Sequence, residues 1–420
     1  MPEMREANLF LALDLGTTTL AGRLLGRDGE VLAEAKRPNP QAVLGNDIIR
    51  RLEASLRGDG KRLQMLLVEG IEAIIAELLN TADAPRVAIG AAAAAGNPGI
   101  TYLLRNLSVE PILFPPHRPP EKQGVFLDPP GLGLDLSAPL FLFPLVSGYV
   151  GGDLVAFLYG FGDFSAADLA PHAPRFYLDI GTNGEMALYD AGRWWTTSVA
   201  AGPAFEGGEI SCGMPVAAGA VTGVRLEGEA LRLQVFGGGA PRGLAGSGLV
   251  ETVAAALEAG LIDASGRIVE PAEVATNLVR HIAETPSGRA LRLYRDAACD
   301  LLLTQQDIRS LQLAKGAVRA GVECLLQRAG LDVGRLGEVV VTGAFGFSLM
   351  PAVLKRVAML PANMIEKVRF VPGGALQGVS RLLVDPAGPA WVQTLADSLK
   401  VYPLSGTPAF EKVFLRSLDF

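Results

Sequence analysis

The chain has 420 residues, of which 49% are hydrophobic and only 19% are charged. This length is more than one ordinary hydrophobic core accommodates, and it predicts two domains. The formal net charge of −7 and the isoelectric point of about 5.3 argue against nucleic acid as the main partner.

No targeting or membrane-spanning segment is recognisable in the sequence. Residues 1–8 are polar, and the most apolar stretch, residues 140–161, is interrupted by proline, glycine and aspartate residues. The three cysteines, Cys212, Cys299 and Cys324, form no CxxC pair and no zinc pattern, which suits a reducing compartment. We therefore expect a cytoplasmic protein that has no membrane partner.

The beginning of the chain predicts a small β-meander with a polar turn. Residues 9–35 contain three short apolar runs typical of strands, and the first leads into Asp14, Gly16, Thr17 and Thr18. Glycine allows the backbone to approach a ligand closely, and N–H groups and threonine hydroxyls can donate hydrogen bonds to phosphate oxygens. An aspartate at the same turn can hold a hydrated metal ion.

A second copy of this pattern follows another apolar run, residues 176–178. It consists of Asp179 and the turn residues Gly181, Thr182, Asn183 and Gly184. A single loop of this kind also joins ordinary hairpins, so one copy is weak evidence. Two copies, 165 residues apart (179 − 14), predict two similar half-domains that face one nucleotide.

Two further segments allow more than one interpretation. Gly246 and Ser247 lie in a glycine-rich run before a predicted helix, where they form either an anion- or ribose-accepting turn or simply a tight loop. Lys315 lies on a long predicted helix, residues 307–328. Its side chain either flanks the adenine or the phosphates, or belongs to the solvated face of an amphipathic helix.

The two Asp-x-Gly-Thr motifs resemble the phosphate motifs of the acetate and sugar kinase, Hsp70 and actin (ASKHA) superfamily. Within it, the chain resembles the ATP-dependent reductive activators of corrinoid proteins over nearly its whole length. The densest resemblance is in residues 201–214, which include Glu206. A strand at residues 339–341 also resembles the start of the superfamily's adenosine motif, which continues here with Gly343, Ala344, Phe345 and Gly346.

The resemblance implies an α/β fold of two RNase-H-like domains with a nucleotide cleft between them. The first domain is expected over residues 1–160, with a proline-rich excursion and a connecting helix. The second is expected over residues 175–400, with an inserted subdomain, and residues 401–420 form a C-terminal tail. Small residues at 147–160 and 372–383 predict two connecting helices that cross closely.

ATP and Mg²⁺ are the cofactors that the resemblance implies. Asp14 and Asp179 would hold Mg²⁺ largely through water, while the threonines and the asparagine of the two loops bind phosphate. Asp153 is interpreted with equal weight as a third metal-facing carboxylate and as a charge at the first turn of a helix. Either Asp179 or Glu206 would orient the attacking water.

The implied function is an ATPase that helps a corrinoid protein partner undergo reduction from Co(II) to Co(I). No iron–sulfur cluster is expected in this chain, because the activators' ferredoxin-like domain does not precede the ATPase part and three scattered cysteines do not supply four thiolates. A separate ferredoxin-like protein is therefore the expected electron donor, and a homodimer is left open. The alternatives are a small-molecule kinase of the same fold and a non-redox ATP-dependent remodelling protein. A kinase needs a general base, and no segment of the first domain stands out as one.

Overall fold

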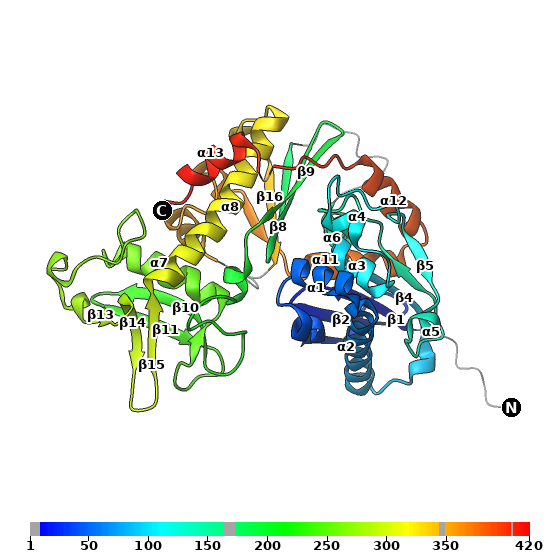
Figure 1. The fold of residues 1–420 in the computed structure, drawn as a ribbon, viewed down its shortest axis with the longest axis horizontal. Coiled ribbons are helices and arrows are strands. Elements are labelled where there is room, and N and C mark those ends of the chain that lie inside the picture. The colour runs from blue at the N-terminus through cyan, green and yellow to red at the C-terminus, as the bar shows by residue number, and fades with distance from the viewer. Residues whose placement is uncertain (1–8, 163–172, 344–348, 405) are drawn as a thin grey trace. The chain divides into compact units, whose positions relative to one another are not determined.

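The computed structural model describes the chain in four stretches, residues 9–162, 173–343, 349–404 and 406–420. The described residues form two compact units (Figure 1). Unit 1 comprises residues 9–162, 192–196 and 373–401, and unit 2 comprises the remaining described residues. Within this part of the chain, no helix combines the length and the apolar character that crossing a bilayer requires.

Unit 1 is built on a six-stranded sheet in the order β3-β2-β1-β4-β6-β5. Its strands are β1 (Leu9–Leu15), β2 (Thr19–Leu25), β3 (Val31–Pro38), β4 (Ile89–Gly96), β5 (Val125–Leu127) and β6 (Leu140–Leu142). The first three strands form the antiparallel meander that the apolar runs predict. On the other side of β1, β4 and β6 continue the sheet in parallel.

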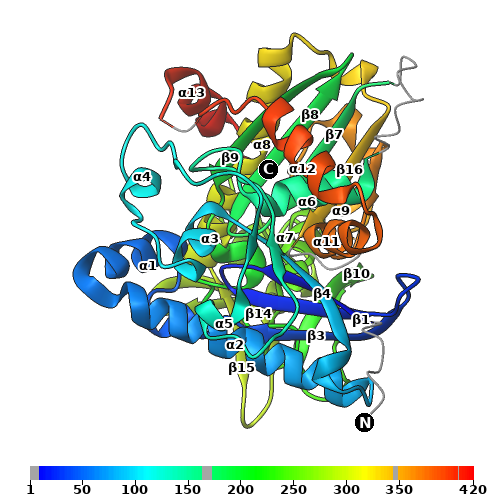
Figure 2. The ribbon, with the colours of Figure 1, turned by 90° about the vertical axis from the view of Figure 1, so that its right-hand side faces the viewer.

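Helices cover this sheet and provide its core. They are α1 (Ile48–Ala54), α2 (Gly60–Thr81), α3 (Pro98–Leu104), α4 (Glu110–Leu113), α5 (Pro129–Leu132), α6 (Gly152–Phe161), α11 (Gly374–Val384) and α12 (Gly388–Ser398). Short helical turns are η1 (Pro40–Leu44), η2 (Ser55–Asp59) and η3 (Arg86–Ala88). The long α2 packs against β2 and β3, and Figure 2 shows it alongside β3, whereas α11 packs against β1 and β4.

The alternation of side chains along β1 decides where its polar residue points. Leu11, Leu13 and Leu15 belong to one buried core cluster together with Leu78 of α2. Because successive side chains of a strand point to opposite faces, Asp14 lies on the face of β1 that is turned away from this cluster. The polar end of β1 is thus separated from the main hydrophobic core of unit 1.

The helices α6 and α11 cross closely, as the small residues of both segments predict. A Cβ atom on Gly378 would collide with the carbonyl oxygen of Ala156, and one on Gly160 would lie 2.7 Å from the nitrogen of Gly378. The crossing therefore depends on glycine at both positions. It also places residues 373–401 in unit 1, which differs from the expected second domain of residues 175–400.

The main sheet of unit 2 repeats the order of five of the six strands of unit 1. It has the order β17-β16-β7-β8-β9, with β7 (Arg175–Ile180), β8 (Asn183–Asp190), β9 (Arg193–Ala200), β16 (Glu338–Gly343) and β17 (Val368–Phe370). The sequential strands β7, β8 and β9 lie beside each other, as β1, β2 and β3 do in unit 1. On the other side of β7, β16 pairs with it in parallel, as β4 does with β1. The shared order agrees with the two similar halves that the repeated motif predicts, and the mixture of sheets and helices confirms the α/β class that the resemblance implies.

The other strands of unit 2 form two small sheets, β11-β10-β12 and β13-β14-β15. They are β10 (Ala220–Glu227), β11 (Ala230–Val235), β12 (Gly243–Leu244), β13 (Ile282–Thr285), β14 (Gly288–Arg295) and β15 (Asp300–Thr304). The helices are α7 (Gly246–Glu258), α8 (Gln305–Ala329), α9 (Pro351–Arg356), α10 (Ala362–Ile365) and α13 (Pro408–Arg416). Short turns are η4 (Pro203–Glu206), η5 (Pro271–Glu273), η6 (Asn277–His281) and η7 (Val333–Arg335).

Candidate functional site

The first predicted loop is the tight connection between β1 and β2 in unit 1. A Cβ atom on Gly16 would lie 2.5 Å from the carbonyl oxygen of Thr19, so the turn requires glycine at this position. Thr17 and Thr18 occupy the tip of the turn, and both are at least partly exposed. The loop therefore has the strand–turn–strand form that its sequence predicts.

Two buried asparagines brace this loop. Asn39 donates from Nδ2 to the carbonyl oxygen of Gly16 at 2.9 Å and from its backbone nitrogen to the carbonyl oxygen of Thr18 at 2.8 Å. Asn97 donates from Nδ2 to Oγ1 of Thr17 at 2.9 Å. Since this bond occupies a lone pair of the hydroxyl oxygen, the hydroxyl proton of Thr17 is available to donate to another group. Sequence reasoning missed both bracing roles, because each asparagine is distant in sequence from the loop.

Asp14 and Asp153 form a carboxylate pair in unit 1. Asp153 lies in the first turn of α6, where its Oδ1 accepts from the backbone nitrogen of Leu154 at 3.0 Å. Burial, reinforced by the negative charge of Asp153, raises the pKa of Asp14 to about 7, while Lys36 acts in the opposite direction. Asp153 therefore lies in the first turn of a helix, as one of its two interpretations predicts, and its charge also raises the pKa of Asp14.

Gly151 lies between Asp153 and Asn97, in a space that admits no side chain. A Cβ atom on Gly151 would lie 2.6 Å from Oδ1 of Asp153 and 2.6 Å from the Cα atom of Asn97. The start of α6 thus passes directly over the residue that braces Thr17. Asp14, Thr17, Asn97 and Asp153 are consequently parts of one polar region of unit 1.

The second predicted loop connects β7 and β8 in unit 2. The backbone nitrogen of Gly181 donates to the carbonyl oxygen of Asn183 at 2.9 Å, which closes the turn. Gly184 pairs with Ile180, and a Cβ atom at Gly184 would press against Val199 at 3.1 Å. Asn183 and Gly184 thus begin the returning strand, while Gly181 and Thr182 form the turn itself.

Glu206 lies against this second loop. Its Oε1 accepts from the backbone nitrogen of Thr182 at 3.0 Å and from Oγ1 of Thr182 at 3.2 Å. Its Oε2 is buried and has no hydrogen-bond partner among the described residues. The structure therefore brings Glu206 to Thr182, although 24 residues separate them in the sequence.

A buried carboxylate that sequence reasoning missed lies beside Asp179. The register of β7 and β8 places Glu185 directly opposite Asp179, and Glu185 is only 5% exposed. Directly opposed residues of an antiparallel pair point to the same face of the sheet. The only signal in the sequence was an acidic residue next to an apolar strand segment, which is too common to identify a site.

Gly343 closes over the end of β7. It has a φ of +109°, and a Cβ atom there would collide with the carbonyl oxygen of Ile180 and lie 2.6 Å from Oδ1 of Asp179. Gly343 itself therefore lies beside Asp179, and glycine is required at this position. The other predicted residues of the adenosine motif, Ala344, Phe345 and Gly346, lie outside the described residues.

Gly246 and Ser247 are engaged in packing at the start of α7. A Cβ atom on Gly246 would collide with the carbonyl oxygen of Phe205, and Oγ of Ser247 donates to the carbonyl oxygen of Thr222 at 2.8 Å. These contacts favour the tight-loop interpretation over an anion- or ribose-accepting turn. The glycine allows α7 to approach the backbone that precedes Glu206.

The placement of Lys315 differs from both interpretations of its sequence. It is fully buried, its ammonium donates to the carbonyl oxygen of Asp419, and it lies 4.9 Å from the ring centroid of Phe420. Burial, aided by the charge of Arg319, lowers the pKa of Lys315 to about 8. Lys315 therefore connects α8 to the last residues of the chain, and it does not lie on a solvated face.

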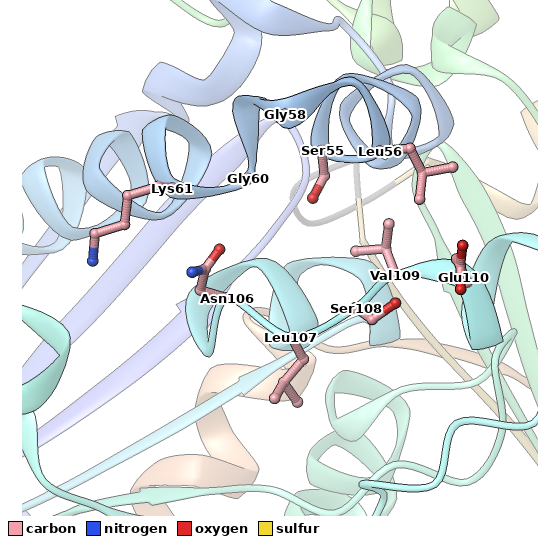
Figure 3. Close-up of a pocket in the computed structure, with 10 residues that line it drawn as sticks. All are labelled: Ser55, Leu56, Gly58, Gly60, Lys61, Asn106, Leu107, Ser108, Val109 and Glu110. Carbon is pink, nitrogen blue, oxygen red and sulfur yellow. The ribbon is translucent and has the colours of Figure 1, made fainter.

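A hollow of about 390 Å³ lies in unit 1, away from the predicted site residues (Figure 3). It is bordered by the turn η2, the start of α2 and residues 106–110. Its one cationic side chain, Lys61, donates to Oε1 of Gln64 at 2.7 Å and is thus engaged by its own helix. The hollow contains none of the loop residues described above, and we assign it no role in the candidate site.

Solved and curated proteins resemble the chain over most of its length. The solved structure of a reductive activator for corrinoid,iron-sulfur protein superposes with a TM-score of 0.88 at 28% identity, covering 100% of this chain and 67% of that one. The corrinoid activation enzyme RamQ of Eubacterium limosum is 26% identical over 435 residues, covering 98% of this chain and 70% of RamQ. A [Co(II) methylated amine-specific corrinoid protein] reductase of Methanosarcina barkeri is 27% identical over 263 residues, covering 57% of this chain and 43% of the reductase.

Two family descriptions match the chain consecutively. Residues 9–162 match the RACo middle region, and residues 173–420 match the C-terminal domain of RACo, the ASKHA domain. Together with the structural similarity at 28% identity, these matches confirm the family that the phosphate motifs and residues 201–214 indicate. The chain belongs to the RACo family, and its C-terminal part is the ASKHA domain of that family.

Proposed function

We propose that this protein binds and hydrolyses ATP to promote the reduction of a corrinoid protein from Co(II) to Co(I). The observation that carries the proposal is the pair of matching loops, in which a glycine turn follows an aspartate-bearing strand at the same place in two sheets that share the order of five strands. Membership of the RACo family and similarity to proteins named as corrinoid activators or reductases support the choice of partner.

Each unit contributes its own phosphate-binding groups. In unit 1, the hydroxyl proton that Asn97 leaves available on Thr17 would donate to a phosphate oxygen. In unit 2, the donors are the backbone nitrogen and hydroxyl of Thr182, together with the side chain of Asn183. The backbone of Gly343 would pack against the nucleoside. That both loops contact a single nucleotide stays a prediction.

The carboxylates of unit 1 fit a hydrated divalent cation. Burial, and in second place the negative charge of Asp153, raise the pKa of Asp14, and a bound cation would offset the repulsion between these two carboxylates. Mg²⁺ usually keeps several waters and takes few protein ligands, so a pair is sufficient. When bound, the ion would neutralise charge on the phosphate oxygens. Asp179 carries the corresponding carboxylate of unit 2, and it or Glu206 would orient the attacking water.

The electron for cobalt reduction must come from a redox group, because ATP hydrolysis supplies free energy but no electron. The three cysteines, Cys212, Cys299 and Cys324, are too few and too far apart in the sequence to form a four-thiolate iron–sulfur cluster. We propose that a separate iron–sulfur protein donates the electron, and that nucleotide turnover by this chain makes the transfer to the corrinoid protein favourable.

A reconstitution experiment tests this function. The purified protein is combined with MgATP, a reduced low-potential ferredoxin and a candidate Co(II) corrinoid protein, and Co(I) formation is followed by its absorption spectrum. We expect Co(I) only when all components are present and ATP is hydrolysed. ATP hydrolysis that proceeds without any effect on the corrinoid protein would contradict the redox role and favour another ATP-driven task. Failure of the protein to bind or hydrolyse ATP would contradict the proposed function as a whole.

A further inference from the structure

Glu206 holds the groups of Thr182 that a phosphate would use. The backbone nitrogen and the hydroxyl of Thr182 both donate to Oε1 of Glu206, at 3.0 and 3.2 Å. The carboxylate also lies close over the loop, because a Cβ atom on Gly181 would be 3.2 Å from the same oxygen. A carboxylate is an anionic acceptor like a phosphate oxygen, so the two compete for the same donors.

The two anions cannot share this position without a cost. At about 4 Å, two like unit charges repel by roughly 1 kcal/mol in water and by several times more in a less polar environment. A backbone N–H has a single proton, and it makes one strong, well-aligned hydrogen bond. Close binding of a phosphate to Thr182 therefore requires Glu206 to withdraw.

The surroundings of Glu206 favour its release by side-chain rotation. Phe205 is fully buried, and its carbonyl oxygen is pressed against Gly246, so the backbone just before Glu206 is anchored. The carboxylate itself is held less completely, because its buried Oε2 lacks a partner among the described residues. A buried oxygen without a hydrogen bond is unfavourable, so the observed position of the side chain is only partly stabilised.

We propose that Glu206 is an internal competitor of the nucleotide: it occupies the phosphate donors of Thr182 and is displaced when a nucleotide phosphate binds the second loop. This inference rests on the proposed function, because it assumes that the loop binds nucleotide. It adds a regulatory role to the site. Glu206 weakens nucleotide binding, and its displacement by a phosphate changes the conformation of the turn η4. The turn η4 packs against both α7 and α8, so a change in its conformation would alter its contacts with these two helices of unit 2.

The test compares nucleotide affinities of the full-length wild-type protein and three variants by titration calorimetry. Glu206→Gln keeps the shape of the side chain but removes its charge, and Glu206→Ala removes the acceptor altogether. Glu209→Gln is the matched control, because Glu209 is an exposed glutamate of the same segment. The ligands are AMP-PNP with Mg²⁺, which carries phosphates, and adenosine, which carries none. Thermal unfolding of each variant verifies that it is folded.

We expect both Glu206 variants to bind AMP-PNP about tenfold more tightly than the wild type, because loss of one charge-assisted competing hydrogen bond corresponds to roughly this factor. Adenosine affinity should be the same in all proteins, and Glu209→Gln should match the wild type. A folded Glu206→Gln variant that binds AMP-PNP equally or more weakly overturns the inference while the proposed function stands. An equal gain for adenosine also overturns it. If the wild type and every variant fail to bind AMP-PNP, both the inference and the proposed nucleotide site are wrong.

Discussion

Asn97 donates a hydrogen bond from Nδ2 to Oγ1 of Thr17 at 2.9 Å, although 80 residues of sequence separate them. The parallel pairing of β1 with β4 makes this possible, since it places Leu15 beside Gly96 at the ends of the two strands. With its other side-chain atom, Oδ1, Asn97 caps α3 by accepting from the backbone nitrogen of Ile100 at 3.0 Å. One buried amide thus connects the first loop to a helix start.

Replacement of Asn97 by alanine should destabilise unit 1 and weaken nucleotide binding. The variant loses a helix cap and a buried hydrogen bond, which together correspond to about 2 kcal/mol of unfolding free energy. Urea denaturation and AMP-PNP titration measure the two effects. Asn80→Ala, at an exposed position near the end of α2, serves as the control and should change neither quantity. Unchanged stability of Asn97→Ala would show that the cap and the brace contribute nothing.

Replacement of Gly343 by alanine should cost more stability than its backbone conformation alone explains. Gly343 and Gly288 have nearly the same φ, +109° and +112°, but a Cβ atom at Gly288 would meet nothing within 4 Å. Gly288→Ala therefore measures the conformational penalty, on the order of 1 kcal/mol. Gly343→Ala adds the collision with Ile180, which should cost about 1–3 kcal/mol more and displace Asp179. Equal unfolding free energies in the two variants would contradict the close approach at Gly343.

Lys315 should make the stability of the protein depend on pH in the alkaline range. Its pKa is lowered to about 8 in the folded protein from an ordinary value of 10.5, so between these values the unfolded chain binds more protons. The unfolding free energy should therefore rise with pH across this window and fall again as pH decreases towards 8.

Urea denaturation between pH 7.5 and 10.5 measures this dependence. Because other groups titrate in the same range, the informative quantity is the difference between the wild type and Lys315→Met, which should grow in favour of the wild type as pH rises. Lys412→Met, which removes an exposed lysine of α13, should follow the wild type. A Lys315→Met variant whose difference from the wild type stays constant with pH would show that the burial of this ammonium has no such effect.

Replacement of Asp14 by asparagine should lower the rate of ATP hydrolysis strongly and leave the fold intact. The change removes a charge that we assign to cation binding, and it removes no side-chain volume. Loss of one such electrostatic contribution corresponds to about a hundredfold or greater fall in kcat. Steady-state ATPase assays at saturating Mg²⁺ measure the effect, and circular dichroism verifies folding. Asp28→Asn, in the exposed turn between β2 and β3, should keep wild-type turnover. Wild-type turnover in Asp14→Asn as well would exclude the first loop from the site.

The sequence by itself determined the local features of this protein. Strands, turns and the glycines within them depend on residues that are neighbours in the chain, so the apolar runs around Asp14 and Asp179 predicted two strand–turn–strand loops, and the structure contains both. The small residues of α6 and α11 likewise predicted a close helix crossing. The repetition of one motif indicated two similar halves, because similar local sequences form similar local structures.

The tertiary structure alone decided the partners of individual polar groups. Hydrogen bonds and charge interactions depend on distances of a few ångströms between atoms, and strand register sets these distances for residues far apart in sequence. Register therefore placed Glu185 opposite Asp179, and packing brought Glu206 to Thr182. The same packing gave Lys315 a buried partner in the last residues of the chain, where its sequence pattern predicted solvent or a ligand. A pattern of residue types predicts which elements form, whereas the contacts between elements determine what each polar side chain does.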